Sequence, residues 1–306
     1  MKNWIALALL LTGCSHAPRA QLPLSAAITL SPDGREVGTY VSSWNGFRTS
    51  SYWIEGPTGL ILIDTQFLLS AGEEFVDWAE KTTGKKVVLA VVLHPNPDKF
   101  NGTAMLQARG VRVITSEQVL AVIPAVHKLR LGWFYDRFKP DYPLEQPKPE
   151  SFGAKDTVIE AGGIKLSLHI LGAGCSSAHV VAQYGGHVFV GDLATIGFHS
   201  WLELGLLDEW LKRLDDIRAL KPQFVHTGRG GTGDSSTLDR EEDYLRAVIG
   251  VVQAHHPRAG KKLSSSARKE IVEKIRGLYP AYDFPLFLKV DALWARMSAH
   301  PENFAD

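Results

Sequence analysis

Two adjoining stretches decide the fold: Lys86-Val-Val-Leu-Ala-Val-Val-Leu93 and, directly after it, His94-Pro-Asn-Pro-Asp-Lys-Phe-Asn-Gly102. The first is an unbroken apolar run, which is typical of a strand that a sheet buries on both faces. The second contains His94 and Asp98, residue types that bind metals and transfer protons. We therefore expect an α/β protein in which a buried strand leads directly into a polar segment.

Strand and helix patterns alternate on both sides of this region. Short β-type stretches are expected at 37–41, 51–55, 59–64, 111–115, 156–171, 179–191 and 223–226. Helical spacing is expected at 71–81, 117–131 and 207–219, and through most of the chain after residue 240. Segment 135–152, rich in proline and aromatic residues, is expected to be an irregular insertion. The chain contains a β-rich stretch followed by βα segments, and this order occurs twice. It predicts layered α/β packing.

The composition excludes several classes of protein. The chain has 306 residues, 45% hydrophobic and 22% charged, which are ordinary values for a globular protein. Its 33 basic residues are balanced by 33 acidic ones, so the basic surplus of a nucleic-acid-binding protein is missing and no nucleic-acid partner is expected. Two cysteines are too few for a disulfide framework.

The N-terminus has the pattern of a bacterial secretion signal. Lys2 precedes an apolar run at 4–11, which is shorter than the roughly 20 residues that a spanning helix needs. The run ends in Leu11-Thr-Gly-Cys14, which resembles the lipobox of bacterial lipoproteins. That resemblance implies a lipid on Cys14 and a membrane as partner. Ser15, where an aspartate usually marks inner-membrane retention, favours the periplasmic side of the outer membrane. The alternative is an ordinary signal peptide with a chance cysteine.

Four landmarks, in the right order, resemble those of the metallo-β-lactamase superfamily. The first is the strand at 59–65, which ends in an aspartate, and the second is 94–102, similar to the family's His-x-His-x-Asp-His signature. The third is 172–179, similar to a Gly-x-Gly-His-Thr loop, with Gly191-Asp192 after it as the family's Gly-Asp turn. The fourth is 220–230, which resembles the closing Gly-His-Gly. The resemblance implies an αββα sandwich with its site on loops along one edge.

The resemblance and the N-terminal signal together divide the chain into four parts. We assign 1–14 to the signal and lipobox and 15–35 to a tether with a first strand region. The metallo-β-lactamase-like domain is expected at 36–254 and a helical C-terminal extension at 255–306.

The family binds one or two zinc ions, and a metal-bound water becomes its nucleophile. Seven positions of this chain match the family's ligand positions or their immediate neighbours. Three keep the family's residue, His94, Asp98 and Asp192, and four differ, Asn96, Lys99, Cys175 and Arg229. A cysteine thiolate still binds zinc, whereas an asparagine is a feeble ligand and an arginine offers no lone pair.

The two metal positions are affected unequally. The first would be built by His94, Asn96 and Cys175, and the second by Asp98 and Asp192 together with Arg229. A guanidinium is repelled by a metal ion but pairs well with two carboxylates. We therefore predict that Arg229, helped by Lys99, occupies the second position. The expected cofactor is one zinc ion at most, or none.

Plainer roles are open for the same residues. His94 could make a hydrogen bond at a strand end, Asp98 could cap a helix and Asp192 could be a turn residue. Other histidines near the matched loops could also replace lost ligands, although a lone histidine is more often an ordinary polar contact. They are His179, His199 and His226.

Three functions follow from these residues. The first is a hydrolase of ester, thioester, lactone or lactam bonds, with at most one metal on His94, Cys175 and a carboxylate, and with Asp98 orienting the attacking water. The second is a non-catalytic envelope lipoprotein that binds a ligand or partner, a reading favoured by the change at four of seven positions. The third is metal-free chemistry with Cys175 as nucleophile and His179 as base.

Overall fold

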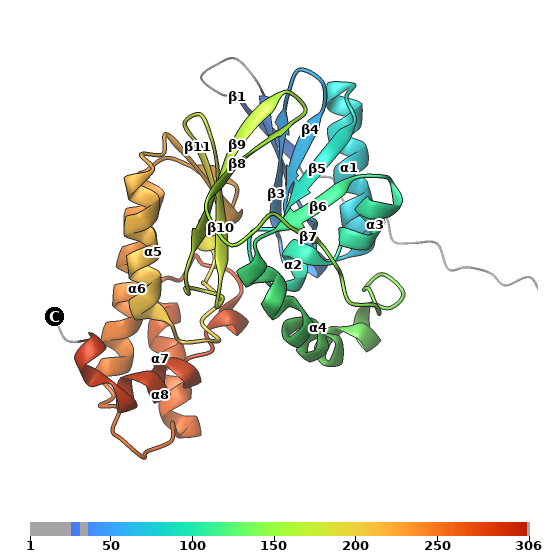
Figure 1. Cartoon of the computed structure of the whole chain (residues 1–306). Coiled ribbons are helices and arrows are strands. Elements are labelled where there is room, and N and C mark those ends of the chain that lie inside the picture. Colours follow the sequence, from blue (N-terminus) through green and yellow to red (C-terminus); the bar gives the residue numbers. More distant parts are fainter. Residues whose placement is uncertain (1–25, 31–35, 305–306) are drawn as a thin grey trace, which may run out of the picture.

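The computed structural model describes residues 26–30 and 36–304, so the predicted signal, lipobox and most of the tether lie outside the described residues. Two sheets pack face to face, and helices cover the outer side of each (Figure 1). The αββα sandwich that the resemblance implies is therefore confirmed. Among the described residues, no helix combines the length and the apolar character needed to cross a membrane.

The first sheet has the strand order β1-β2-β3-β4-β5-β6-β7 and is parallel from β4 onward. Its strands are β1 (Ala26–Leu30), β2 (Glu36–Val41), β3 (Ser50–Glu55), β4 (Leu60–Ile63), β5 (Val87–Val91), β6 (Arg112–Thr115) and β7 (Glu150–Ser151). The second sheet has the order β13-β12-β11-β10-β9-β8, with β11 and β12 parallel. Its strands are β8 (Thr157–Ala161), β9 (Ile164–Leu171), β10 (His179–Tyr184), β11 (His187–Thr195), β12 (Phe224–Arg229) and β13 (Thr232–Gly233).

The helices form the outer layers and the lower part of the molecule. They are α1 (Leu69–Thr83), α2 (Pro97–Phe100), α3 (Thr103–Ala108), α4 (Glu117–Phe138), α5 (Leu207–Ala219), α6 (Ser236–Gln253), α7 (Ser265–Leu278) and α8 (Asp291–Ala299). Three 3-10 helices accompany them, η1 (Trp44–Gly46), η2 (Pro285–Phe287) and η3 (Pro301–Phe304). Helices α1 and α3 lie outside the first sheet and α5 and α6 outside the second (Figure 1). Apolar side chains of α7 and α8 share one core cluster with α5, α6 and β11.

Two sequence expectations are wrong in detail. Segment 135–152 does not begin as an irregular insertion, because α4 continues to Phe138. The aromatic rings that suggested irregularity pack instead, since Phe134 and Phe138 stand edge-on to Phe67 with ring centroids 5.1 and 5.4 Å away. The Gly191-Asp192 pair is not a turn but part of β11, where the register to β12 shifts at Gly191 with φ at +57°.

The two sheets are tied together at one edge, where β3 approaches β12. The hydroxyl of Tyr52 donates to the carbonyl oxygen of Thr227 at 2.6 Å, and Thr49 forms an isolated antiparallel bridge with Arg229. Strands β4 and β5 of the first sheet and β11 and β12 of the second end near this edge (Figure 1). The loops that leave these strands therefore converge on one place.

Candidate functional site

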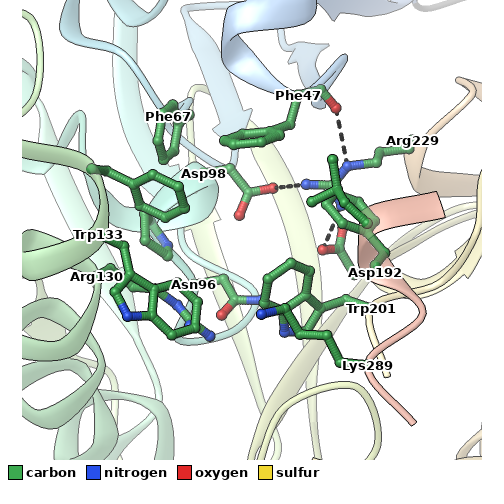
Figure 2. A pocket seen from close by; sticks show the side chains of 14 residues that line it. Phe47, Phe67, Asn96, Asp98, Arg130, Trp133, Asp192, Trp201, Arg229 and Lys289 are labelled. Carbon is green, nitrogen blue, oxygen red and sulfur yellow. Dashed lines mark hydrogen bonds and ion pairs between the residues drawn. The ribbon is translucent and has the colours of Figure 1, made fainter. Parts of the chain in front are cut away.

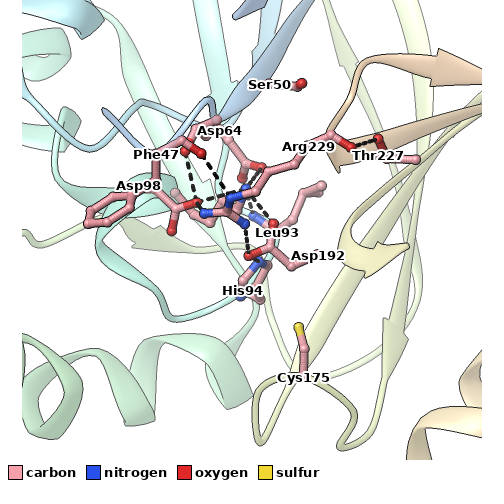
Figure 3. Close-up of polar contacts among 12 residues, drawn as sticks. Phe47, Ser50, Asp64, Leu93, His94, Asp98, Cys175, Asp192, Thr227 and Arg229 are labelled. Atoms are coloured by element: carbon pink, nitrogen blue, oxygen red, sulfur yellow. Dashed lines mark hydrogen bonds and ion pairs between the residues drawn. The ribbon is translucent and has the colours of Figure 1, made fainter. Parts of the chain in front are cut away.

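The strand ends bring a cluster of charged side chains together. Asp64 follows β4, Asp98 and Lys99 lie on the short helix α2 after β5, Asp192 lies in β11 and Arg229 ends β12. Figure 3 shows the side chains of Asp98 and Asp192 pointing toward that of Arg229, with Asp64 nearby. All five are buried. We call Asp64, Asp98, Lys99, Asp192 and Arg229 the charge cluster.

Arg229 forms a fork between two carboxylates. Its Nη1 donates to Asp192 Oδ2 at 2.7 Å and its Nη2 donates to Asp98 Oδ2 at 2.8 Å. Its Nε donates to the backbone oxygen of Phe47 at 3.1 Å, which fixes the plane of the guanidinium. Charge-assisted hydrogen bonds such as these are shorter and stronger than those between neutral groups. The prediction that Arg229 lies between Asp98 and Asp192 agrees with this geometry.

Lys99 also lies close to these carboxylates. Its Nζ lies 3.0 Å from Asp192 Oδ1, 3.2 Å from Asp98 Oδ2 and 3.7 Å from Asp64 Oδ2, and the side chain is 0% exposed. Asp64 adopts a left-handed backbone conformation, with φ at +63°, and its Oδ1 accepts a hydrogen bond from the amide of Leu93 at 2.9 Å. Three carboxylates thus surround two cations.

The ionisation of the cluster follows from burial and these pairings. Burial would raise the pKa of both Asp98 and Asp192, but Lys99 and Arg229 outweigh it and hold both pKa values below the ordinary range. For Asp64 burial prevails over the more distant Lys99 and raises its pKa to about 6. Burial alone would lower the pKa of Lys99, yet the carboxylates raise it. Near neutral pH the Asp98 and Asp192 anions therefore balance the two cations, and Asp64 adds a further negative charge as the pH rises through its pKa.

A second cluster lies beside the first. His94, Cys175 and His179 are buried, and one donor atom of each lies within 4.8 Å of the others. His179 Nδ1 is 2.9 Å from the Gly172 carbonyl oxygen and must donate to it, so His179 Nε2 is the acceptor that faces Cys175 Sγ at 3.1 Å. Burial raises the pKa of Cys175 and lowers that of His179 to about 3. A neutral thiol therefore faces a neutral imidazole.

His94 has one ring nitrogen engaged and one without a hydrogen bond. Its Nδ1 is 3.1 Å from Ser176 Oγ, while its buried Nε2 has no hydrogen-bond partner and lies 3.7 Å from Asp192 Oδ2. This nitrogen is the contact between the two clusters.

The residues present can be tested against the zinc ions that the resemblance implies. At the second position the carboxylates of Asp98 and Asp192 already accept hydrogen bonds from Arg229 and form ion pairs with Lys99, so a metal ion does not fit there. At the first position Asn96 is a feeble zinc ligand by its chemistry, and it lines the pocket described below. His179 lies near His94 and Cys175 instead, and an N, S, N donor set suits one zinc ion.

The other candidate histidines lie elsewhere. His226 Nε2 is 2.8 Å from His187 Nδ1, and its Nδ1 is 2.8 Å from Thr232 Oγ1. His199 Nδ1 is 3.0 Å from the hydroxyl of Tyr244. Neither joins the His94 group. The plainer role of Asp98 as a helix cap is also wrong, since Asp98 lies inside α2.

A pocket of about 260 Å³ opens directly over the charge cluster (Figure 2). Asp98, Asp192 and Arg229 form part of its lining, and aromatic rings form most of the remainder. The sequence reasoning missed its cationic and tryptophan residues, which come from α4, from the loop before α5 and from the C-terminal extension. They are Arg130, Trp133, Trp201 and Lys289.

Comparisons with known proteins agree with the fold. A metallo-β-lactamase type 2 from Elizabethkingia meningoseptica is 22% identical over 257 residues, which cover 80% of this chain and 94% of that protein. The metallo-β-lactamase from Pontibacter korlensis superimposes with a TM-score of 0.57 at 22% identity, covering 74% of this chain and 99% of that one. The DIM-1 metallo-β-lactamase superimposes with a TM-score of 0.55 at 16% identity and the same coverages. Residues 44–229 match the family model for the metallo-β-lactamase superfamily, and the chain therefore belongs to that superfamily.

Proposed function

We propose that this chain is a non-catalytic member of the superfamily that binds a small ligand in the pocket over the charge cluster. The observation that carries the proposal is the position of Arg229 and Lys99, whose cationic groups lie among Asp98, Asp192 and Asp64. Metallohydrolases need an ion with an open coordination position to activate water. An arginine and a lysine supply positive charge without that position.

The state of Asp98 supports the same proposal. A general base works best when its pKa lies near the operating pH. Asp98 is held well away from that condition, because Lys99 and Arg229 lower its pKa against the effect of burial. Its Oδ2 also accepts from Arg229 and from the hydroxyl of Thr49. A carboxylate engaged in this way is a poor partner for an attacking water.

A second candidate function is a hydrolase with one zinc ion, of the ester, thioester, lactone or lactam class. The observation that favours it is the group of His94, Cys175 and His179, in which His94 Nε2 has no hydrogen bond. Bound there, the ion would lower the pKa of a coordinated water and polarise a carbonyl. Two observations speak against this hydrolase. The Cys175 thiol and the His179 imidazole already form a hydrogen bond with each other, and all three side chains are buried.

The metal content of the purified chain tests the proposal. The chain is prepared without chelator or immobilised nickel, and zinc is then offered before gel filtration. We expect no retained zinc and an unfolding temperature that a chelator does not change. About one zinc per chain, lost in Cys175→Ser and in His179→Gln, would favour the single-zinc hydrolase and justify an ester and lactam screen.

We also propose that the chain is anchored on the periplasmic side of the outer membrane through a lipid on Cys14. The support is the Leu11-Thr-Gly-Cys14 sequence behind a short apolar run, with Ser15 after it. Metabolic labelling with a fatty acid tests this, together with membrane fractionation. Cys14→Ala is expected to abolish labelling, and a labelled Cys14→Ala chain would refute the anchor.

A further inference from the structure

We propose that the pocket over Arg229 binds an apolar monoanion, a carboxylate with an alkyl or aryl body, whose anionic group pairs with Lys289. This inference names the ligand class of the proposed function and rests on it. Three observations carry it: the aromatic walls, the internal pairing of the other charges, and the position of Lys289.

The walls are suited to an apolar body. Figure 2 shows Phe47 and Phe67 on the opposite side of the pocket from Trp201, and Phe134 and Phe287 also line it. Phe287 packs edge-on against Trp201, with centroids 4.9 Å apart, so both rings hold fixed positions. Pockets of this kind bind ligands chiefly by burying apolar surface, and a few placed polar groups fix the orientation.

The mouth of the pocket exposes apolar surface. Trp133 on α4 is 42% exposed and Leu286 on η2 is 55% exposed, and both line the pocket. Large apolar side chains that gather at a cavity often mark a binding site. An apolar ligand that enters between them would shield both from water.

Most charges at the pocket are paired within the protein. Arg229 is held by Asp98 and Asp192. Arg130 forms a two-pronged pair with Glu203, whose Oε2 also accepts from the indole of Trp201 at 3.0 Å. These groups have their partners before any ligand arrives, so they add little to the attraction of a charged ligand.

Lys289 is the exception. Among the described residues, no carboxylate lies within ion-pair distance of its Nζ. The ammonium lies over two tryptophan rings instead, 4.6 Å from the centroid of Trp133 and 5.0 Å from that of Trp201. Figure 2 shows it beside Trp201 at the rim of the pocket. The rings hold the cation in place without neutralising it. Glu203, whose pKa Lys289 helps to lower, is already paired with Arg130.

The charge count sets the ligand class. Five ionisable side chains line the pocket, and four of them are paired. Asp98 and Asp192 pair with Arg229 and with Lys99 outside the lining, and Arg130 pairs with Glu203. Within the described part of the chain, Lys289 is the one lining charge without an ion pair, so it is the charge left to a ligand. One unpaired cation beside an apolar cavity favours a monoanion over a cation, a dianion or a neutral ligand.

Equilibrium dialysis of the full-length chain tests the inference with a matched series of probes: octanoate and 3-phenylpropanoate, their alcohols 1-octanol and 3-phenyl-1-propanol, octylammonium and acetate. At pH 7.5 we expect at least one carboxylate to bind more tightly than its alcohol by about tenfold, which is the effect of one charge-assisted contact. Octylammonium and acetate are expected to bind more weakly still. Equal binding of each carboxylate and its alcohol would overturn the inference, and so would no binding of either carboxylate.

Variants assign the effect to the pocket. Lys289→Gln is expected to weaken carboxylate binding about tenfold and to leave alcohol binding unchanged. Lys128→Gln, an exposed lysine of α4 outside the pocket lining, is the matched control and should change neither. Trp133→Ala is expected to weaken both probes. If Lys289→Gln and Lys128→Gln behave alike, the role of Lys289 is refuted.

The two proposals fail separately. Zinc bound to the purified chain would refute the non-catalytic function, whatever the dialysis shows. A metal-free chain that binds neither octanoate nor 3-phenylpropanoate would refute the ligand class alone.

Discussion

Replacing Arg229 with methionine tests whether the arginine stabilises the charge cluster as the geometry indicates. The change keeps a long apolar stem but removes three hydrogen bonds, to Asp192, to Asp98 and to the backbone of Phe47. Removing one partner of a buried ion pair typically costs about 3–5 kcal/mol, because it leaves an uncompensated buried charge. Lys99 stays 3.0 and 3.2 Å from the same two carboxylates and offsets part of the loss. We therefore expect the lower end, about 3 kcal/mol, at pH 7.5.

Urea unfolding measures this loss, with Arg218→Met as the control. Arg218 also contacts three carboxylates, but its side chain is 30% exposed, so its removal should cost less than about 1 kcal/mol. For a domain of this size, 3 kcal/mol corresponds to a fall in unfolding temperature of roughly 6–12 °C. Adding Asp98→Asn to Arg229→Met removes one of the two stranded carboxylates and should restore a large part of the loss.

The stability that the charge cluster contributes should decrease at acidic pH. In the wild type the folded pKa values of Asp98 and Asp192 are lowered, so their stabilisation is complete above the unfolded pKa of about 3.9 and is lost as the pH falls through the folded values. The difference in unfolding free energy between the wild type and Arg229→Met should thus be largest near neutral pH and should decrease below about pH 4. A gap at pH 7.5 no larger than that of Arg218→Met would refute the reasoning.

Three further outcomes are expected. Burial raises the pKa of Glu241 to about 7 from its ordinary 4.5, so the contribution of Glu241 to stability falls as the pH rises between these values. In urea unfolding, the Glu241→Gln variant should be as stable as the wild type at pH 5 and more stable by up to about 3 kcal/mol at pH 8. Equal stabilities at pH 8 would contradict this. A Cβ on Gly228 would lie 1.8 Å from Asp192 Oδ1, so Gly228→Ala should lower the thermal stability by about 2 kcal/mol, whereas the unobstructed Gly277→Ala should not. The thiol of Cys175 is 1% exposed and its pKa is raised by burial, so iodoacetamide should label it in urea but hardly at all in the native chain, and equal labelling rates would speak against a buried thiol.

The fold and the centre of the charge cluster could be predicted because their signals are local. Asp64 and the segment at 94–102 directly follow strands and Arg229 ends one, and the ends of parallel strands gather at one edge. The pairing of Arg229 with Asp98 and Asp192 followed from the resemblance, which places all three at ligand positions of the second metal, and from charge, since two buried carboxylates without a metal require a cation. Asp64 was recognised only as the end of a strand, because its contact with Lys99 needs the left-handed turn that follows β4.

The pocket could not be predicted, because its walls come from distant parts of the chain. Trp133 and Lys289 are 156 positions apart (289 minus 133) and meet only when the C-terminal extension packs beside α4. The aromatic residues of both segments were visible, but their pattern is equally typical of an ordinary core. For the same reason the helix α4 was cut short at Leu131, since the contacts of Phe134 and Phe138 with Phe67 are tertiary.

Under the proposed non-catalytic function, Arg229 and Lys99 take the place of a metal ion at the second position. Together they supply two positive charges, as a divalent ion would, so Asp98 on α2 and Asp192 in β11 stay ionised. An ion with a free coordination position, however, attracts the reacting group of a substrate directly. Arg229 and Lys99 are already paired with carboxylates of the protein, so they add little to the attraction of a charged ligand. Recognition of a charged ligand must then come from a cation outside the cluster, and the unpaired Lys289 at the rim is placed to provide it.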